Sequence, residues 1–297
     1  MSMDYTHTLR LPRTDFPMRA VSGGADGEAR LLSDLAGLQA GLGTQARAEV
    51  GYRSLRNAFR WMLGCLAHGG AGDEPCEAPA LERHVLSLLP EPGRMDAEAL
   101  CAFAREGLSA FYFDVRKDAL YCDPASSGRR LACLETMRNA FHALAGAASE
   151  WTPNLVDEAR ACLPGWAAEP SSAPDSWGET TKGWDRVMQV RQAVNALLER
   201  ARTRRELASS LEAAVTLHVP PDMAEALAAS GWQPEEVLVV SQAVVLPGRE
   251  FSVAWRPAEG LRCARSWRYS GDVGADPAFP DLSARDALAV AELQLAR

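Results

Sequence analysis

Residues 48–67 read AEVGYRSLRNAFRWMLGCLA, and this stretch decides the fold class. Its large apolar side chains recur every three or four positions, as at Leu55, Phe59 and Met62, which is the spacing of one helix face. Polar and charged residues occupy the other positions. The pattern predicts an amphipathic helix that buries its apolar face against neighbouring helices.

The same periodicity continues on both sides of this stretch. Helices are predicted at about residues 29–41, 80–89, 96–123, 128–151 and 153–163. The connections between them are short, and this favours antiparallel neighbours. The chain is therefore expected to be mainly α, with an antiparallel helical bundle.

The pattern changes twice outside the bundle. Residues 164–181 are rich in proline and small polar residues, as in a linker. After a further predicted helix, alternating apolar residues predict strands at 210–219, 235–246 and 251–257. The expected organisation is an extended N-terminal arm (1–28), the bundle (29–163), the linker (164–181), a long helix with a small α+β unit (182–256) and a tail (257–297).

The tail contains an incomplete metal-binding pattern. RCARSWRY at 262–269 is followed by LSARD at 282–286, and only Cys263 is a cysteine in these stretches. Cysteines at positions 266, 283 and 286 would complete Cys-x2-Cys-x16-Cys-x2-Cys, the spacing of a zinc knuckle. We therefore predict a degenerate knuckle at Cys263, Ser266, Ser283 and Asp286 that binds no metal. Packing of Trp267, Tyr269, Phe279 and Leu282 is expected to hold it together.

Composition limits the classes of function. The formal net charge of −8 argues against a generally basic DNA-binding protein, so any RNA site must be a local basic surface. Seven scattered cysteines show no disulfide framework, and no signal peptide or membrane span is recognisable. We expect a cytoplasmic protein that contacts neither membrane nor DNA.

Several blocks resemble the C-terminal region of bacterial isoleucyl-tRNA synthetases. They are GYRSLRNAFRWMLGCL (51–66), LSAFYFDVRKDALYCD (108–123), VMQVRQAVNALLERAR (187–202) and the knuckle-like tail. YTHTLRLPRTDFPMRA (5–20) is similar to the opening of the same synthetases. The resemblance implies a bundle of the anticodon-binding type, a zinc-knuckle tail and tRNA as a partner.

The catalytic features of that family are missing from the sequence. Neither His-Ile-Gly-His nor Lys-Met-Ser-Lys-Ser occurs. Only about 30 residues separate the arm-like block (5–20) from the first resembling block of the bundle (51–66), too few for the two βαβαβ halves of a nucleotide-binding sheet. We therefore expect no enzyme activity, no catalytic residue and no cofactor.

Basic and aromatic residues supply the candidate RNA contacts. Arg53, Arg56 and Arg60 share one helix face and could bind phosphates, although a solvated helix surface has the same pattern. In the tail, arginines surround Trp267, which could stack on an unpaired base or belong to the tail's core. The full candidate set is Arg53, Arg56, Arg60, Arg116, Lys117, Arg129, Arg130, Arg265, Trp267, Arg268 and Tyr269.

The resemblance and the missing catalytic motifs together imply a non-catalytic synthetase paralogue that recognises the anticodon region of tRNA, expected to be isoleucine tRNA, for delivery, sequestration or regulation. The alternative is a protein-interaction module that docks on a synthetase or biosynthetic enzyme without binding RNA. The acidic net charge and the degenerate knuckle favour the alternative.

Overall fold

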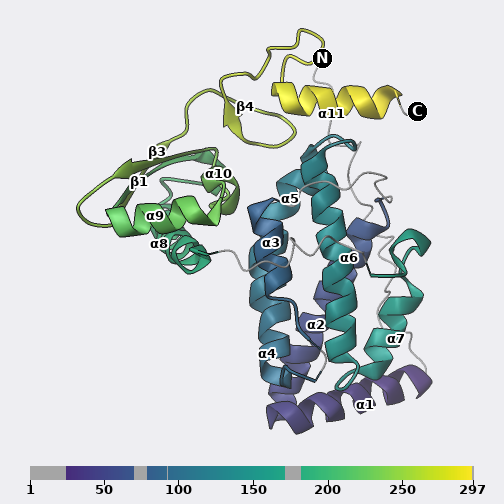
Figure 1. The fold of residues 1–297 in the computed structure, drawn as a ribbon. Coiled ribbons are helices and arrows are strands. Elements are labelled where there is room, and N and C mark those ends of the chain that lie inside the picture. Colours follow the sequence, from purple (N-terminus) through teal and green to yellow (C-terminus); the bar gives the residue numbers. More distant parts are fainter. Residues whose placement is uncertain (1–24, 70–78, 92, 171–181, 296–297) are drawn as a thin grey trace.

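A computed structural model describes residues 25–69, 79–91, 93–170 and 182–295. It is mainly helical, as predicted, and Figure 1 shows a helical bundle, a smaller α+β unit beside it and a tail across one end. Residues 1–24 of the expected arm and 171–181 of the expected linker lie outside the described residues, whereas the first helix begins at Ala25. The bundle helices are α1 (Ala25–Leu42), α2 (Gln45–Leu66), α3 (Ala80–Ser87), α4 (Ala97–Ala102), η2 (Phe103–Tyr112), α5 (Phe113–Cys122), α6 (Gly128–Ala148) and α7 (Pro153–Ala161).

The central helix α2 has the predicted amphipathic character. Its N-terminus is capped by Thr44, whose hydroxyl accepts a hydrogen bond from the backbone N–H of Arg47. Phe59 and Met62 are fully buried, and the Phe59 ring packs edge-on against Phe141 of α6 at 5.4 Å between centroids. The apolar face of α2 is thus the centre of the bundle core.

The predicted long helix from about residue 96 is present but is not α-helical throughout. Asp96 caps its start, and its ten central residues, η2, form a π-helix. The Ser109 hydroxyl donates to the carbonyl of Ala104, five residues earlier, at 2.8 Å. A π-helix has the wider turn of i→i+5 bonding, which periodicity does not separate from an α-helix over ten residues.

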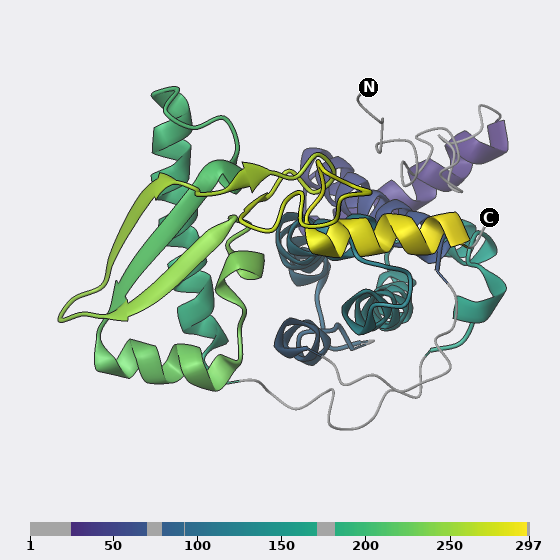
Figure 2. The same ribbon diagram turned by 90° about the horizontal axis from the view of Figure 1, so that it is seen from above.

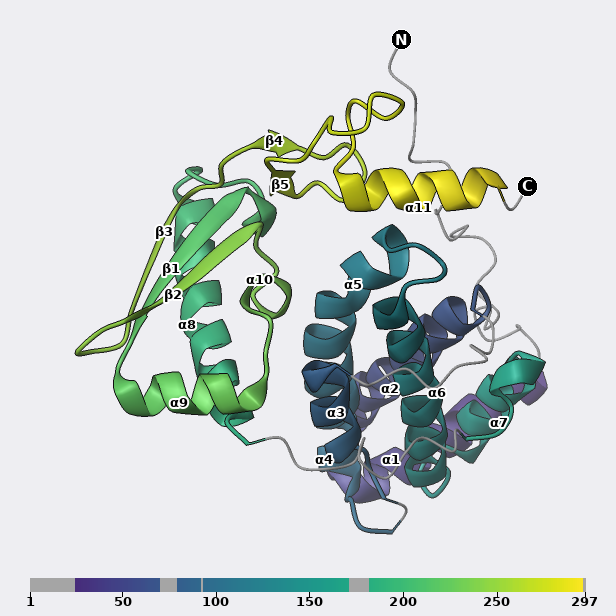
Figure 3. The ribbon, with the colours of Figure 1, turned by 45° about the horizontal axis from the view of Figure 1, so that its top comes forward.

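The α+β unit consists of one long helix against a three-stranded sheet. The sheet order is β2-β1-β3, with β1 parallel to β2 and antiparallel to β3. In β1 the buried Val215, Leu217 and Val219 alternate with less buried residues, and α8 lies along the sheet (Figure 3). The elements are η3 (Gly165–Ala167), α8 (Trp184–Thr203), η5 (Ser210–Glu212), β1 (Ala213–Val219), α9 (Pro221–Ser230), α10 (Pro234–Val237), β2 (Gln242–Pro247) and β3 (Ser252–Pro257).

The strand predicted at 235–246 is only half correct. Its first part is the short helix α10, which starts with Pro234 at a position where the missing N–H does no harm. Val239 then takes a left-handed conformation with φ 54°, and the strand begins at Gln242. The apolar run at 237–240 is buried by this turn rather than by strand pairing.

The tail contains a small hairpin and a helix. The hairpin is β4 (Leu261–Arg262) and β5 (Tyr269–Ser270), and α11 (Ala284–Leu295), which the sequence analysis did not predict, lies across the end of the bundle (Figures 1 and 2). Phe279 and Leu282 pack in the tail's core, as predicted. Trp267 does not: it is 54% exposed, so the prediction that it holds the tail together is wrong. The core is completed by Cys263, Ala287 and Val290.

None of the described helices combines the length and the apolar composition that a bilayer crossing requires.

Candidate nucleic-acid interface

Several residues predicted to contact RNA instead bind other residues of the protein. Arg116 on α5 is 1% exposed. Its guanidinium makes two 2.6 Å hydrogen bonds to the carboxylate of Glu82 on α3 and one of 2.6 Å to Glu236 on α10. Arg116 therefore joins the bundle to the α+β unit, and its interior position takes it out of reach of a phosphate.

Arg129 and Arg130, at the start of α6, also point to protein atoms. Arg129 is ion-paired with Asp123 at 2.5 Å and with Glu236. Arg130 donates to the carbonyls of Leu120 and His68 at 3.4 and 3.3 Å. The two arginines tie helix ends together, although the sequence placed both among the candidate RNA contacts.

Glu236 is held as a carboxylate by this arrangement. Burial by itself would raise the pKa of Glu236, but the guanidinium groups of Arg116 and Arg129 outweigh burial and lower it. The charge of Glu236 is thus retained inside the junction between bundle and α+β unit.

The tail arginines make the next set of contacts. Arg265, with 5% of its side chain exposed, donates to the carbonyls of Tyr121 and Cys122 at the end of α5. Arg268 donates to the carbonyl of Val240 at 2.6 Å and lies 3.5 Å from the carboxylate of Asp118. Both residues were predicted to contact RNA, and in the structure they dock the tail on the other two parts.

The three arginines of α2 do not form one open basic face. Arg56 is paired through both terminal nitrogens with Glu158 of α7, at 2.7 and 2.9 Å, and 11% of its side chain is exposed. Arg60 is half-buried. Arg53 is exposed and donates to the Glu49 carbonyl of its own helix. The predicted face therefore reduces to Arg53.

Trp267 is the candidate that stands out at the surface. It forms the turn of the tail hairpin with φ 64°, a left-handed conformation that bulky residues rarely adopt. The guanidinium carbon of Arg262 lies 5.3 Å from the centroid of its ring. The turn is closed by hydrogen bonds from Trp267 N to Cys263 O and from Cys263 N to Arg268 O, at 3.0 and 2.8 Å.

Two further candidates lie near these groups. Tyr269 is half-buried, and its backbone N–H donates to the hydroxyl of Ser241 at 2.8 Å. Lys117 on α5 is exposed and lies 3.0 Å from Asp114. Of the eleven candidates, Arg53, Lys117 and Trp267 are exposed, and the others are half-buried or buried.

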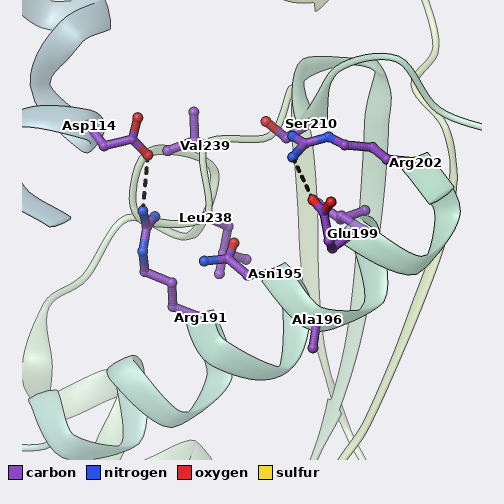
Figure 4. Close-up of a pocket in the computed structure, with 10 residues that line it drawn as sticks. Asp114, Arg191, Asn195, Ala196, Glu199, Arg202, Ser210, Leu238 and Val239 are labelled. Atoms are coloured by element: carbon purple, nitrogen blue, oxygen red, sulfur yellow. Dashed lines mark hydrogen bonds and ion pairs between the residues drawn. The ribbon is translucent and has the colours of Figure 1, made fainter. Parts of the chain in front are cut away.

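A polar cavity of about 440 Å³ lies between α5 and α8 (Figure 4). In it Arg191 reaches Asp114 of α5 at 3.1 Å, and Arg202 reaches Glu199 at 3.1 Å. Because both arginines are paired with carboxylates, the cavity offers no surplus of positive charge to an anionic ligand. Its other lining residues are Asn195, Ala196, Leu198, Ser210, Leu238 and Val239.

No sequence pattern indicated the acidic residues that neutralise the candidate arginines. Glu82, Asp118 and Glu236 lie on three different elements, and no local spacing links them to their arginine partners. Only the tertiary structure brings these charges together.

Comparison with known proteins identifies the relatives of the chain. No protein-family model matches it. Isoleucine–tRNA ligase from Bartonella henselae is 37% identical over 281 residues, that from Brucella abortus 39% over 281 and that from Agrobacterium fabrum 36% over 282. The chain is a homologue of isoleucine–tRNA ligases. The family resemblance drawn from the sequence blocks is thereby confirmed.

The extent of the similarity is uneven. Each alignment covers 82% of this chain and 28% of the ligase. The chain thus spans little more than a quarter of the length of these isoleucine–tRNA ligases, and their activity as whole proteins does not transfer to it by similarity alone.

Proposed function

We propose that this isoleucine–tRNA ligase homologue is a non-catalytic tRNA-binding module that contacts the anticodon region through its tail hairpin. The observation that carries the proposal is the exposed Trp267 ring with Arg262 against it. Bundle and tail together would form the anticodon-binding region, for delivery, sequestration or regulation of isoleucine tRNA. The relatives are named isoleucine–tRNA ligases, and this name supports tRNA as the ligand class.

The chemistry of the Trp267 turn suits an unpaired base. Single-stranded RNA is usually recognised by stacking splayed bases on aromatic rings, with arginine adding a cation–π contact. A ring half open to water on a rigid turn can accept a base with little loss of side-chain freedom. Arg268 fixes this turn against the α+β unit through the Val240 carbonyl.

The structure also changes the set of residues proposed to bind RNA. Trp267 and Arg262 form its centre, and Arg53 and Lys117 are the exposed cations of the original set. Half-buried Tyr269, Arg60 and Arg130 stay within the proposed surface as secondary contacts. Arg56, Arg116, Arg129, Arg265 and Arg268 are assigned to holding the fold.

A binding experiment with two substitutions tests the proposal. Fluorescence anisotropy of the full chain is measured with isoleucine tRNA, an anticodon-swapped version and an unrelated tRNA. Wild-type protein should prefer the isoleucine tRNA, and Trp267→Ala should weaken binding by about 1–3 kcal/mol, the usual contribution of one stacked base. Trp267→Phe keeps an aromatic face and should retain most of the affinity.

Three outcomes would contradict parts of the proposal. Equal affinity for the three tRNAs would remove the anticodon specificity, and unchanged affinity of Trp267→Ala would remove the role of the hairpin. Exchange of pyrophosphate into ATP by the purified chain would contradict its non-catalytic character.

The second candidate function is a protein-interaction module that docks on a synthetase or biosynthetic enzyme. It is favoured by the internal pairing of most candidate arginines and by the edge strand β2, where Val244, Val245 and Leu246 are exposed. This candidate predicts no tRNA binding even at low salt. It also predicts that Arg53→Glu leaves the biological function intact, whereas an RNA-binding role would be weakened.

A further inference from the structure

Four residues from two short segments of the chain meet inside the tail. Cys263 and Ser266 come from the hairpin, and Ser283 and Asp286 come from the start of α11. The Oδ2 atom of Asp286 lies 2.7 Å from Ser266 Oγ, 2.8 Å from Ser283 Oγ and 3.1 Å from Cys263 Sγ. One carboxylate oxygen thus occupies the point on which the other three side chains converge.

These residues do not fit a zinc ion. Structural zinc takes four donors from cysteine thiolate, histidine and carboxylate, and two of the four side chains here are neutral hydroxyls. Among the described residues no group of three or more His, Cys, Asp or Glu side chains is arranged to hold a metal. The Asp286 carboxylate itself fills the central position, so that no space is left for an ion.

The charges around Asp286 oppose a cation as well. Arg265 lies 3.0 Å from its Oδ1 atom, and Arg285 lies 3.3 Å from its Oδ2 atom. A buried carboxylate needs such partners, because an isolated charge in the interior is very costly. Asp286 is 0% exposed, and its two arginines and three hydrogen-bond donors supply that compensation.

We infer that the carboxylate of Asp286 takes the structural place of a metal ion, so that the tail folds around a buried ion-pair cluster and needs no metal. The Asp286 cluster is defined as Cys263, Ser266, Ser283, Asp286 and Arg265. The inference does not depend on tRNA binding.

Unlike a closed metal site, the Asp286 cluster also attaches the tail to the bundle. Arg265, which pairs with Asp286, also donates hydrogen bonds to the carbonyls of Tyr121 and Cys122. Arg285, the other partner of Asp286, also forms an ion pair with Asp118 on α5 at 2.5 Å. The arginines that neutralise Asp286 are therefore the same ones that attach the tail to the bundle. Folding of the tail and docking of the tail are coupled through one carboxylate.

Restoring the cysteines is the direct test. In the triple variant Ser266→Cys/Ser283→Cys/Asp286→Cys, the side chain at position 286 is too short to fill the centre of the cluster. Four sulfur atoms then surround that centre. We expect the full-length triple variant to bind roughly one zinc ion per chain, since four thiolates complete one tetrahedral site. Its Tm should fall when a chelator removes the metal. Wild-type protein should contain no zinc and should keep its Tm in the presence of the chelator.

A second pair of variants does not depend on the triple variant folding. Asp286→Asn keeps the shape but removes the charge that Arg265 and Arg285 face, and its Tm should fall by roughly 5–10 °C. Asp281→Asn changes an exposed aspartate just before α11 and should leave the Tm unchanged. Zinc in the wild-type protein at one per chain would overturn the inference. So would a wild-type Tm that falls with chelator, a folded triple variant that binds no zinc, or an Asp286→Asn variant as stable as Asp281→Asn.

Discussion

Arg116 lies between two carboxylates from different elements, Glu82 on α3 and Glu236 on α10. Removing one partner of a buried ion pair leaves the other charge without compensation, and the cost is typically about 3–5 kcal/mol. We therefore expect Arg116→Met to lower the free energy of unfolding by about that amount, measured by chemical denaturation. The loss should occur although methionine fills much of the same space.

The neighbouring Lys117 provides the matched control. Its side chain is exposed, and its contact with Asp114 is a surface ion pair. Lys117→Met should change the free energy of unfolding by no more than about 0.5 kcal/mol. Equal effects of the two substitutions would show that the Arg116 contacts contribute nothing to stability.

At the level of single residues, sequence predicted the chemistry of the side chains better than their surroundings. Arg116 and Glu236 are 120 positions apart, and no local pattern reveals that they meet. Trp267 was expected to pack in the tail's core, because a large aromatic residue in a small module is usually buried. The left-handed turn instead places it at the surface. A distant contact decides the surroundings of Arg116, whereas a local turn conformation decides those of Trp267.

At the level of elements, periodicity located the helices well. In α2 and α6 it coincides with capping residues, Thr44 and Ser127, so that pattern and boundary agree. The π-helical η2 was not predictable, because its composition is that of an ordinary amphipathic helix. α10 was mistaken for a strand because Val237 to Val240 form an apolar run, and such a run does not distinguish the two.

Gly183 is the residue on which the start of α8 depends. It caps the helix with φ 86°, and a Cβ atom there would lie 2.0 Å from the carbonyl oxygen of Ala226 on α9. The left-handed conformation alone costs a non-glycine residue about 1–2 kcal/mol, and the collision must separate α8 from α9 in addition. Gly183→Ala should therefore lower the free energy of unfolding by more than about 2 kcal/mol in denaturant titrations.

Gly128 at the start of α6 is a suitable comparison. A Cβ atom there meets nothing within 4 Å, and the residue is not in the left-handed region. Gly128→Ala should leave stability unchanged or raise it by up to about 1 kcal/mol, because alanine restricts the unfolded chain. If Gly183→Ala behaved in the same way, the close contact between α8 and α9 would not matter for stability.

At the level of the whole molecule, bundle and tail meet around Asp118 near the end of α5. Arg285 and Arg268 reach it from the tail, and Arg129 reaches it from α6. Burial would raise the pKa of Asp118, but these guanidinium groups outweigh burial and lower it to about 2. Ion pairing of Asp118 is therefore one of the forces that join the tail to the bundle.

The pH dependence of stability follows from this lowered pKa. An unfolded chain ionises its aspartates with a pKa of about 3.9, so the folded state holds the Asp118 charge more strongly. The resulting stabilisation, about 2–3 kcal/mol, is complete above about pH 5 and is lost as the pH falls through about 2 towards 1, where both states are protonated. Asp118→Asn lacks the titrating group. Wild-type protein should therefore be more stable than Asp118→Asn by about that amount near pH 5, and urea titrations at decreasing pH should show the difference vanish. A difference that stays constant from pH 5 to pH 2 would mean that the ionised Asp118 does not hold bundle and tail together.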